Sequence, residues 1–452
     1  MRRGRTSITR SSRRGTDPRQ RVRSPAKGRQ PPRTSTSQES SHATGAKGLD
    51  APHRHRAGHH ASHDDPSPVR HRHGSATATA PATDASAEPA TDASTATLPD
   101  GATGPAAATS AATTPPDTLR DYYRQMVLIR RFEERAGEMY TRAKIGGYCH
   151  LNLGEEATVV GLMSAMEPRD YLFTTYREHG YALCRGVGPG RVMAELFGRT
   201  TGMSGGWGGS MHMFDRRARL LGGYGIVGGQ IPPATGAAFA IGYRGPGGPD
   251  AEAVMCLLGD GTTNIGAFHE SLNIAAIWHL PIVYVVINNQ LGMGTTVNRA
   301  AGEPELYKRA ASYRMPSERV DGNDVVTVRD AARAALTRAR VDRQPALLET
   351  ISFRLRGHSV VDPAKYRSKE EVDRVRALDP LPAFRARLIS DGVLDEAAAA
   401  LIDAEVDERV SAAVQFADDS PAPAPEQLFA HAYAQEVPNT PRALPGDPVL
   451  SG

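Results

Sequence analysis

Two short polar motifs follow apolar runs in the second half of the sequence. Gly259-Asp260-Gly261 comes directly after residues 253–258, and Asn288-Asn289 comes directly after residues 282–287. Asp260 offers a carboxylate oxygen, Asn289 offers an amide oxygen, and the backbone carbonyl of Leu291 adds a third oxygen nearby. Mg²⁺ prefers sites of this kind, in which a few protein oxygens are completed by phosphate oxygens and water. The pair of motifs therefore predicts a site for a divalent cation and a diphosphate.

The glycines of the first motif suit the same chemistry. Glycine lets the backbone approach a diphosphate closely, and a helix that begins near Asn264 directs free N–H groups at it. A Gly-Asp-Gly turn alone carries little information, because it also occurs as an ordinary turn between a strand and a helix. The combination of strand, Gly-Asp-Gly, helix, second strand and Asn-Asn is more specific.

Apolar runs and helical patterns alternate around these motifs. Residues 253–258 and 282–287 are typical of strands buried on both faces of a parallel sheet, and a helix is predicted between them at residues 264–278. Further along the chain, the patterns predict a helix at residues 325–340, a strand at residues 346–353 and helical structure at residues 379–416. This alternation predicts an α/β fold with a doubly wound, mostly parallel sheet, helices on both faces and ligands at the carboxyl ends of the strands.

The folded region is expected to begin near Asp117. Pro115-Pro116 precedes a long predicted helix at residues 119–144, in which apolar residues recur at helical spacing, and a second helix is predicted at residues 154–166. Residues 198–236 are dense in glycine, which indicates either close approach of the backbone to another group or several turns with positive φ. We therefore divide the chain into a long tail at residues 1–116, a folded domain at residues 117–420 and a Pro-rich C-terminal tail at residues 421–452.

The composition excludes several classes of protein. The chain has 452 residues, no apolar run long enough to span a membrane, and only three cysteines, which argues against a disulfide framework or a cysteine-rich zinc module. Its net charge of +4 comes from the N-terminal part, since residues 1–118 hold 17 Lys and Arg against 10 Asp and Glu. The rest is slightly acidic, so nucleic acid is not the expected ligand of the folded domain.

The N-terminal tail has a composition of its own. It lacks Phe, Tyr and Trp, is rich in Ala, Thr, Ser, Pro and Arg, and contains eight of the fifteen histidines. Such a segment buries too little apolar surface to offset the entropy of ordering, so it is predicted to be disordered. A solvated tail, an arm that binds a polyanion or a partner, and an organelle transit peptide all stay open as its role. The sequence does not tell whether the histidines bind metal.

Longer segments around the two motifs carry a family resemblance. They occur in one order: GYCHLNLGEEA at 147–157, TTYREHGYAL at 174–183, GGSMHMFD at 208–215, GGYGIVGGQIP at 222–232, the stretch 259–295, and FRLRGHSVVDPAKYRS at 353–368. Together they resemble the alpha subunit of the thiamine diphosphate-dependent component of 2-oxoacid dehydrogenase complexes. The resemblance covers roughly residues 117–415 and does not extend to the N-terminal tail.

The resemblance implies the cofactors thiamine diphosphate and Mg²⁺ and assigns residues to them. Tyr176 and Arg177 are expected to bind the diphosphate, and arginine suits this role because its guanidinium is permanently charged and can bridge two oxygens. Gly225 and Val227 are expected to hold the aminopyrimidine ring. The diphosphate and metal loop is expected to comprise Asp260, Gly261 and Thr262, with Asp260, Asn289 and Leu291 as the metal ligands.

Two histidines are the expected catalytic residues, and both are also expected to contact the cofactor. His150 and His358 lie in motifs whose family counterparts face the reactive thiazolium ring, where a histidine orients the oxoacid or transfers protons. His212 and His269 are weaker candidates. Ser359 occupies the position at which some members of the family are phosphorylated, and the sequence does not tell whether this chain is.

The resemblance also implies partners and a reaction. Thiamine activation needs a glutamate on the pyrimidine ring, and the folded domain is too short to include the second module that supplies it in this family. A beta subunit is therefore expected to supply the glutamate in an α2β2 assembly. The implied reaction is oxidative decarboxylation of pyruvate, with transfer of the acetyl group to the lipoyl group of a dihydrolipoyl acyltransferase.

Other functions remain as alternatives. Gln290-Leu291 departs from the Arg-Tyr pair usual in the pyruvate branch, so alpha subunits that serve branched-chain 2-oxoacids or acetoin stay open. An alternative from another class is a nucleic-acid-binding or scaffolding protein that acts through the basic tail. The few cysteines and the lack of a signal peptide predict a cytoplasmic protein, with the mitochondrial matrix as the alternative location.

Overall fold

The computed structural model describes residues 114–430, so the predictions about the N-terminal tail up to residue 113 and about residues 431–452 lie outside it. Its centre is a six-stranded sheet with the order β2-β1-β3-β4-β8-β7, in which every pairing is parallel. The strands are β1 (Tyr171–Thr175), β2 (Leu220–Tyr224), β3 (Val254–Gly259), β4 (Ile282–Asn288), β7 (Ser317–Asp321) and β8 (Ala346–Ile351). A separate antiparallel hairpin pairs β5 (Leu291–Gly292) with β6 (Thr295–Thr296).

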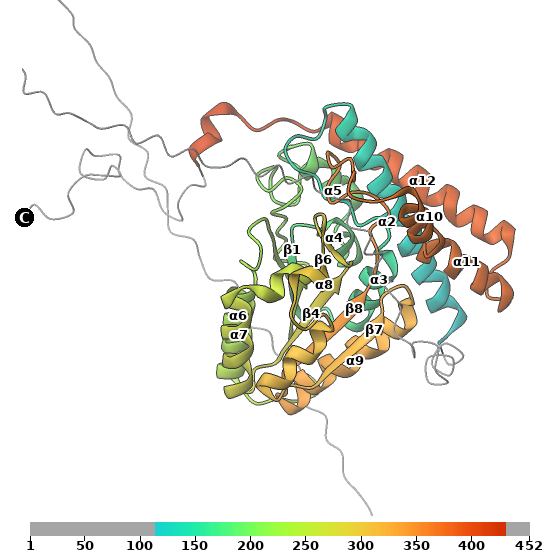
Figure 1. The fold of residues 1–452 in the computed structure, drawn as a ribbon. Helices are drawn as coiled ribbons and strands as arrows, with labels where there is room; N and C mark the ends of the chain where they lie inside the picture. The colour runs from blue at the N-terminus through green and yellow to red at the C-terminus, as the bar shows by residue number, and fades with distance from the viewer. Residues whose placement is uncertain (1–113, 431–452) are drawn as a thin grey trace, which may run out of the picture. The chain divides into compact units, whose positions relative to one another are not determined.

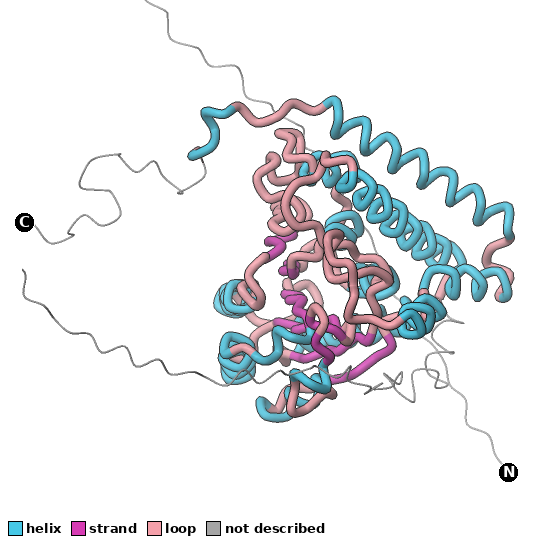
Figure 2. The backbone as a smooth tube through the Cα atoms, turned by 45° about the horizontal axis from the view of Figure 1, so that its top comes forward, coloured by secondary structure: helices cyan, strands magenta, loops and turns pink. Residues whose placement is uncertain are grey.

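Helices cover both faces of this sheet (Figure 1). On one face lie α6 (Ile231–Arg244), α7 (Gly266–Ile277) and the 3-10 helix η2 (Leu306–Tyr313). The other face packs against α3 (Glu156–Ala165) and α9 (Val325–Asp342). Beyond these, α2 (Pro116–Thr141) lies side by side with the long α12 (Glu396–Asp419), as Figures 1 and 2 show. The predicted doubly wound α/β fold is confirmed.

The sequence of β3 shows why both faces are covered. Side chains of a strand point alternately to opposite faces, so an unbroken apolar run buries both of them. In β3, Val254, Cys256 and Leu258 belong to the core beneath α6 and α7, whereas Met255 and Leu257 belong to the core beneath α3 and α9. Each of these side chains is at most 1 % exposed. The strand that leads to Asp260 is therefore held rigidly from both sides.

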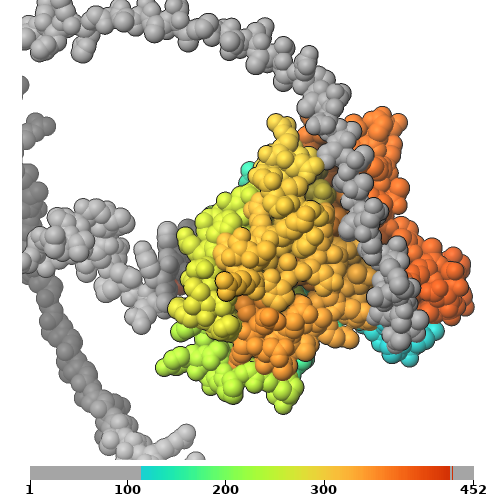
Figure 3. All heavy atoms as spheres, turned by 60° about the horizontal axis from the view of Figure 1, so that its bottom comes forward, coloured from blue at the N-terminus to red at the C-terminus, as the bar shows by residue number. Residues whose placement is uncertain are grey.

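Seven further helical elements complete the described part of the chain. They are α4 (His179–Cys184), α5 (Pro189–Leu196), η1 (Asp260–Asn264), α8 (Val297–Ala300), α10 (Lys369–Ala377), α11 (Pro380–Ser390) and η3 (Pro425–Phe429). Figure 3 shows the face on which the segments near residues 240–280 and 300–340 lie side by side, where α7 contacts η2. No helix within residues 114–430 is both long enough and apolar enough to cross a membrane.

Several element boundaries differ from the predictions. The helix expected from Asn264 is interrupted: the 3-10 helix η1 ends there, Ile265 is extended, and α7 begins at Gly266. The helical region at 379–416 is two helices, separated by a turn in which Gly392 adopts a φ of +68°. Three strands of the six-stranded sheet were not predicted, and neither was the short hairpin of β5 and β6. β2 contains two glycines and the edge strand β7 is largely polar, so neither has the pattern of a buried strand, and β1 went unrecognised.

Candidate active site

A cavity of about 800 Å³ opens at the carboxyl ends of β3 and β4. The two strands are paired with Gly259 opposite Ile287, so the polar motifs that follow them emerge next to each other. Ligands of doubly wound folds bind at this edge of the sheet. Apart from the weaker candidates His212 and His269, every residue for which a cofactor, metal or catalytic role was predicted lines the cavity: His150, Tyr176, Arg177, Gly225, Val227, Asp260, Gly261, Thr262, Asn289, Leu291 and His358.

A guanidinium cation binds two of the three protein oxygens that were expected to bind the metal. Nη1 of Arg354 donates to Oδ1 of Asn289 and to the carbonyl oxygen of Leu291, at 2.6 Å in each case. Nη2 of the same side chain donates to the carbonyl of Met293 at 3.2 Å. Arg354 follows β8 and reaches the ends of β4 and β5 across the cavity edge. The oxygens of Asn289 and Leu291 therefore converge on one donor group, and their coordination of a metal stays a prediction.

Asp260 lies at the start of η1 and is buried. Burial raises the pKa of its carboxyl group, and the charge of Arg354 and the backbone N–H of Gly261 act in the opposite direction. A divalent cation would favour the charged carboxylate in the same way as Arg354 does. Within residues 114–430 no three His, Cys, Asp or Glu side chains cluster as metal ligands, so a cation here depends on amide and carbonyl oxygens in addition to Asp260.

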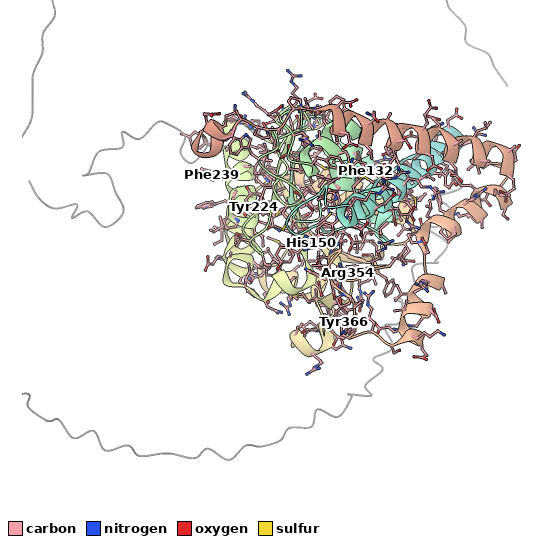
Figure 4. All side chains as sticks on the ribbon, turned by 90° about the horizontal axis from the view of Figure 1, so that it is seen from above. Phe132, His150, Tyr224, Phe239, Arg354 and Tyr366 are labelled. Atoms are coloured by element: carbon pink, nitrogen blue, oxygen red, sulfur yellow. The ribbon has the colours of Figure 1, made fainter. Side chains whose placement is uncertain are left out.

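His150, Tyr176 and His358 form an aromatic cluster beside these oxygens. The ring centre of His150 lies 4.4 Å from that of Tyr176 and 5.1 Å from that of His358. Burial, followed by the charge of Arg177, lowers the pKa of His150 to about 2 and that of His358 to about 4. Both imidazoles are therefore neutral at neutral pH, and Nδ1 of each is buried without a partner in the described part of the chain. Figure 4 labels His150 and Arg354, which both line the cavity.

Arg177 connects the walls of the cavity. Its Nη1 donates to the carbonyl of Leu151 at 2.6 Å, and its Nη2 donates to the carbonyl of His358 at 2.9 Å. Its Nε lies 3.8 Å from Oε2 of Glu155. Arg177 thus ties the two histidine-bearing segments together while it lines the cavity. Contact of Arg177 with a diphosphate stays a prediction.

The mouth of the cavity is apolar. Tyr148, Val227, Met293 and Val361 all line the cavity and are each more than half exposed. Large apolar side chains gathered around an opening mark a surface at which a ligand or another protein is expected to bind. Of the predicted aminopyrimidine residues, Val227 belongs to this exposed set, whereas Gly225 is half-buried.

A buried polar network supports the segment that contains His150. The ring of His179 lies between Glu133 and Ser210, with Nδ1 2.9 Å from Oε2 of Glu133 and Nε2 2.9 Å from Oγ of Ser210. The backbone N–H of His150 donates to Oγ of Ser210, and that of Asn152 donates to Glu133. The network therefore joins α2, α4 and the Gly-rich segment to the backbone on both sides of Leu151.

The Gly-rich segment is organised by one carboxylate. Glu195 of α5 is fully buried, and its two oxygens accept hydrogen bonds from the backbone N–H groups of Ser204, Gly206, Gly208 and Gly209 at 2.7–3.2 Å. Both interpretations of the high glycine content apply: the backbone approaches this carboxylate, and Gly205, Gly206 and Gly209 adopt positive φ. Glu195 itself was not identified, because nothing near it in the sequence indicates its partners.

The weaker histidine candidates do not line the cavity. His212 is exposed next to Gly225, and the exposed His269 has its Nδ1 2.7 Å from the hydroxyl of Tyr313. Ser359 does line it, beside His358. Sequence reasoning missed Glu155 and Arg354, which also line it. Both stand inside the motif segments quoted above, so their position next to predicted residues was the available signal.

Comparison with known proteins assigns the chain to a family. The family model described as "Dehydrogenase E1 component" matches residues 124–426. The chain belongs to the dehydrogenase E1 component family. Its E1 relatives include the "Pyruvate dehydrogenase E1 component subunit alpha" of Rhizobium meliloti, which is 45% identical over 308 residues that cover 68% of this chain and 87% of the relative. The protein of the same name from Zymomonas mobilis is 44% identical over 315 residues, which cover 69% of this chain and 88% of the relative.

A plant relative belongs to the same group. The "Pyruvate dehydrogenase E1 component subunit alpha-3, chloroplastic" of Oryza sativa is 42% identical over 342 residues, covering 75% of this chain and 80% of the relative. The E1 alpha subunit resemblance predicted from the sequence is therefore confirmed, and with it the enzyme class, a thiamine diphosphate-dependent 2-oxoacid dehydrogenase. The names of these relatives favour the pyruvate branch over the branched-chain, acetoin and nucleic-acid-binding alternatives.

Proposed function

We propose that this chain, as the alpha subunit of a pyruvate dehydrogenase, binds thiamine diphosphate and Mg²⁺ in the cavity described above. One observation carries the proposal: the residues predicted for both groups come from separate segments of the sequence, and all of them line one cavity. The oxygens of Asn289 and Leu291 already converge on a cation, the guanidinium of Arg354. The names and identities of the relatives support pyruvate as the substrate.

Bound thiamine diphosphate supplies an electron sink that accepts the electron pair left when carbon dioxide departs from the oxoacid. Tyr176 and Arg177 bind the diphosphate, and Asp260, Asn289 and Leu291 hold the cation. His150 and His358 are neutral, so each offers a lone pair or an N–H to the oxoacid without adding charge next to Arg177. Such neutral imidazoles orient the substrate and hold or move a proton at the reacting atoms.

A beta subunit completes the site in this proposal. The carboxylates that line the cavity are Glu155, Asp260 and Asp362. Glu155 accepts hydrogen bonds from two amide groups, and Asp362 accepts them from the backbone N–H of His358 and the hydroxyl of Tyr366. Asp260 is needed for the cation. The glutamate that activates the cofactor is therefore expected from a second subunit, docked over the apolar mouth in an α2β2 assembly.

The remaining partner is the acceptor of the acetyl group. A lipoyl group on a dihydrolipoyl acyltransferase takes up the acetyl fragment. We propose a cytoplasmic location, as the sequence predicted.

The test is 2-oxoacid-dependent reduction of a dye by the chain co-expressed with its beta subunit. Pyruvate, 3-methyl-2-oxobutanoate and acetoin are compared, with and without thiamine diphosphate and Mg²⁺. We expect turnover of pyruvate that requires both cofactors and is lost in Asp260→Ala. Asp250→Ala is the control, because Asp250 is exposed at a distant turn. Preferred turnover of either other substrate would refute the choice of pyruvate, and an assembled pair that binds no thiamine diphosphate would refute the proposal as a whole.

A further inference from the structure

Glu155 connects the predicted metal ligand Asn289 to the buried Asn152 by hydrogen bonds. It is the N-cap residue of α3, is 2 % exposed, and lines the cavity. Its Oε1 accepts a hydrogen bond from Nδ2 of Asn289 at 2.9 Å. Its Oε2 accepts one from Nδ2 of Asn152 at 3.1 Å. Each carboxylate oxygen is therefore engaged with the N–H₂ group of a different amide.

This contact decides which way the amide of Asn289 points. An amide has a donor side and an acceptor side, and an ionised carboxylate only accepts. With Nδ2 on Glu155, Oδ1 must face the opposite direction, and there it accepts from Nη1 of Arg354 at 2.6 Å. The carboxylate of Glu155 accepts from one side of the amide and the guanidinium of Arg354 donates to the other, so both contacts favour the same orientation of Asn289.

Glu155 is itself prevented from rotating. Oδ1 of Asn152 accepts from the backbone N–H of Gly180 at 3.1 Å, so Asn152 presents only its N–H₂ group to Glu155. The backbone N–H of Glu155 donates to the carbonyl of Asn152 at 3.1 Å. On the other side, Nε of Arg177 lies 3.8 Å from Oε2. The carboxylate is therefore held by α4, by its own turn and by the arginine predicted to bind the diphosphate.

We infer that Glu155 is a positioning residue of the cation site, and that it holds Asn289 with Oδ1 toward the cation. The inference rests on the proposed function, in which Asn289 is a metal ligand. An amide rotated by half a turn would present its N–H₂ group, which has no lone pair for a cation and repels it. Partners of this kind, which orient a ligand without touching the metal, typically change metal affinity by about 10- to 100-fold.

The test measures cation affinity directly. The complex of this chain with its beta subunit is freed of metal and titrated with Mn²⁺ in the presence of thiamine diphosphate, and free Mn²⁺ is followed by electron paramagnetic resonance. We expect Glu155→Ala to weaken Mn²⁺ binding about 10- to 100-fold. Glu155→Gln keeps an acceptor oxygen for Asn289 and should lose less. Thr158→Val is the control, since it removes another buried hydrogen bond of α3, which goes to the carbonyl of Gly322 and not to Asn289.

The same substitution in a second background, Asn289→Asp, distinguishes a loss of the amide orientation from a general loss of structure. In Asn289→Asp both side-chain oxygens can bind a cation, so no particular orientation has to be enforced. We expect Glu155→Ala to weaken Mn²⁺ binding less than about threefold when Asn289 has been replaced by Asp. In the chain that keeps Asn289, the same substitution should weaken binding at least about tenfold. A general structural defect would cost the same in both backgrounds.

The outcomes distinguish the inference from the proposed function. Equal losses in the two backgrounds, or no loss in the Asn289 background, would overturn the role of Glu155 while the metal site stands. If the unmodified complex binds no Mn²⁺ with thiamine diphosphate, the proposed metal site fails and the inference fails with it. Tight binding by the unmodified complex together with background-dependent losses supports both.

Discussion

Arg354 must leave two oxygens before a divalent cation can bind them, so its replacement is expected to tighten metal binding. Nη1 of Arg354 lies 2.6 Å from Oδ1 of Asn289 and 2.6 Å from the carbonyl oxygen of Leu291. The side chain is part of a cavity wall that also contains Asp260. The perturbation is Arg354→Met, which keeps most of the side-chain length and removes both the charge and the donors.

The magnitude follows from these two contacts. A hydrogen bond to a charged group contributes about 1.5–3 kcal/mol to the stability of the structure that contains it. The displaced guanidinium recovers part of this through hydration, so the net cost of displacing Arg354 is about 1.5–3 kcal/mol for the pair. Since about 1.4 kcal/mol is a factor of ten, Arg354→Met should bind Mn²⁺ about 10- to 100-fold more tightly than the unmodified chain. Loss of the positive charge near Asp260 acts in the same direction.

The assay is titration of the complex with Mn²⁺ in the absence of thiamine diphosphate, so that any contact between Arg354 and a diphosphate does not enter. Arg356→Met is the matched control, because Arg356 is an exposed arginine two residues away on the same loop and donates to neither oxygen. We also expect metal-free Arg354→Met to unfold at a lower temperature and to regain stability on addition of Mn²⁺. Unchanged or weaker Mn²⁺ binding would refute the view that Arg354 occupies the place of a cation.

Three further predictions concern the walls of the site. Burial lowers the pKa of His358 to about 4, whereas its imidazole in the unfolded chain has a pKa near 6.5. As the pH falls below about 6.5 the unfolded state therefore binds a proton first, and the free energy of unfolding decreases. His358→Asn should flatten the dependence of this free energy on pH in urea unfolding, and an unchanged dependence would contradict the burial argument. Glu195→Gln places an N–H₂ group against backbone donors and should cost about 2–4 kcal/mol in urea unfolding, which a loss below about 1 kcal/mol would exclude. In Gly154→Ala, Cβ would lie 2.2 Å from the carbonyl oxygen of Phe353 at a φ of +95°, so about 3 kcal/mol should be lost; Gly186→Ala, with a φ of +87° and open space, should lose clearly less, and equal losses would show that backbone strain alone is responsible.

The candidate site could be predicted from the sequence because its strongest signals are local. Gly259-Asp260-Gly261 and Asn288-Asn289 each follow an unbroken apolar run, and such runs are typical of central strands in a sheet covered on both faces. Neighbouring parallel strands bring their carboxyl ends to one edge, so the two motifs were expected to meet. The cavity-lining positions of His150 and His358 came from the family resemblance, since no periodic pattern indicates them.

Elements without a periodic signal were missed. The edge strand β7 (Ser317–Asp321) is largely polar because its outer side is not paired, and β2 (Leu220–Tyr224) contains two glycines. Both form strands because their neighbours, β8 and β1, offer hydrogen-bonding partners. Strand formation there is a property of the sheet rather than of the segment.

The sequence by itself determined the alternating strands and helices, the two polar motifs and the order in which they occur, because these depend on residue type and short-range spacing. Only the tertiary structure decided which polar groups pair. Glu155, Asn289 and Arg354 are far apart along the chain, yet a carboxylate, an amide and a guanidinium lie in one line of hydrogen bonds. A hydrogen bond forms only when the donor–acceptor distance is correct to within a few tenths of an ångström and the donor points at the acceptor. No pattern of residue types contains that information, which exists only once the strands and helices are packed together.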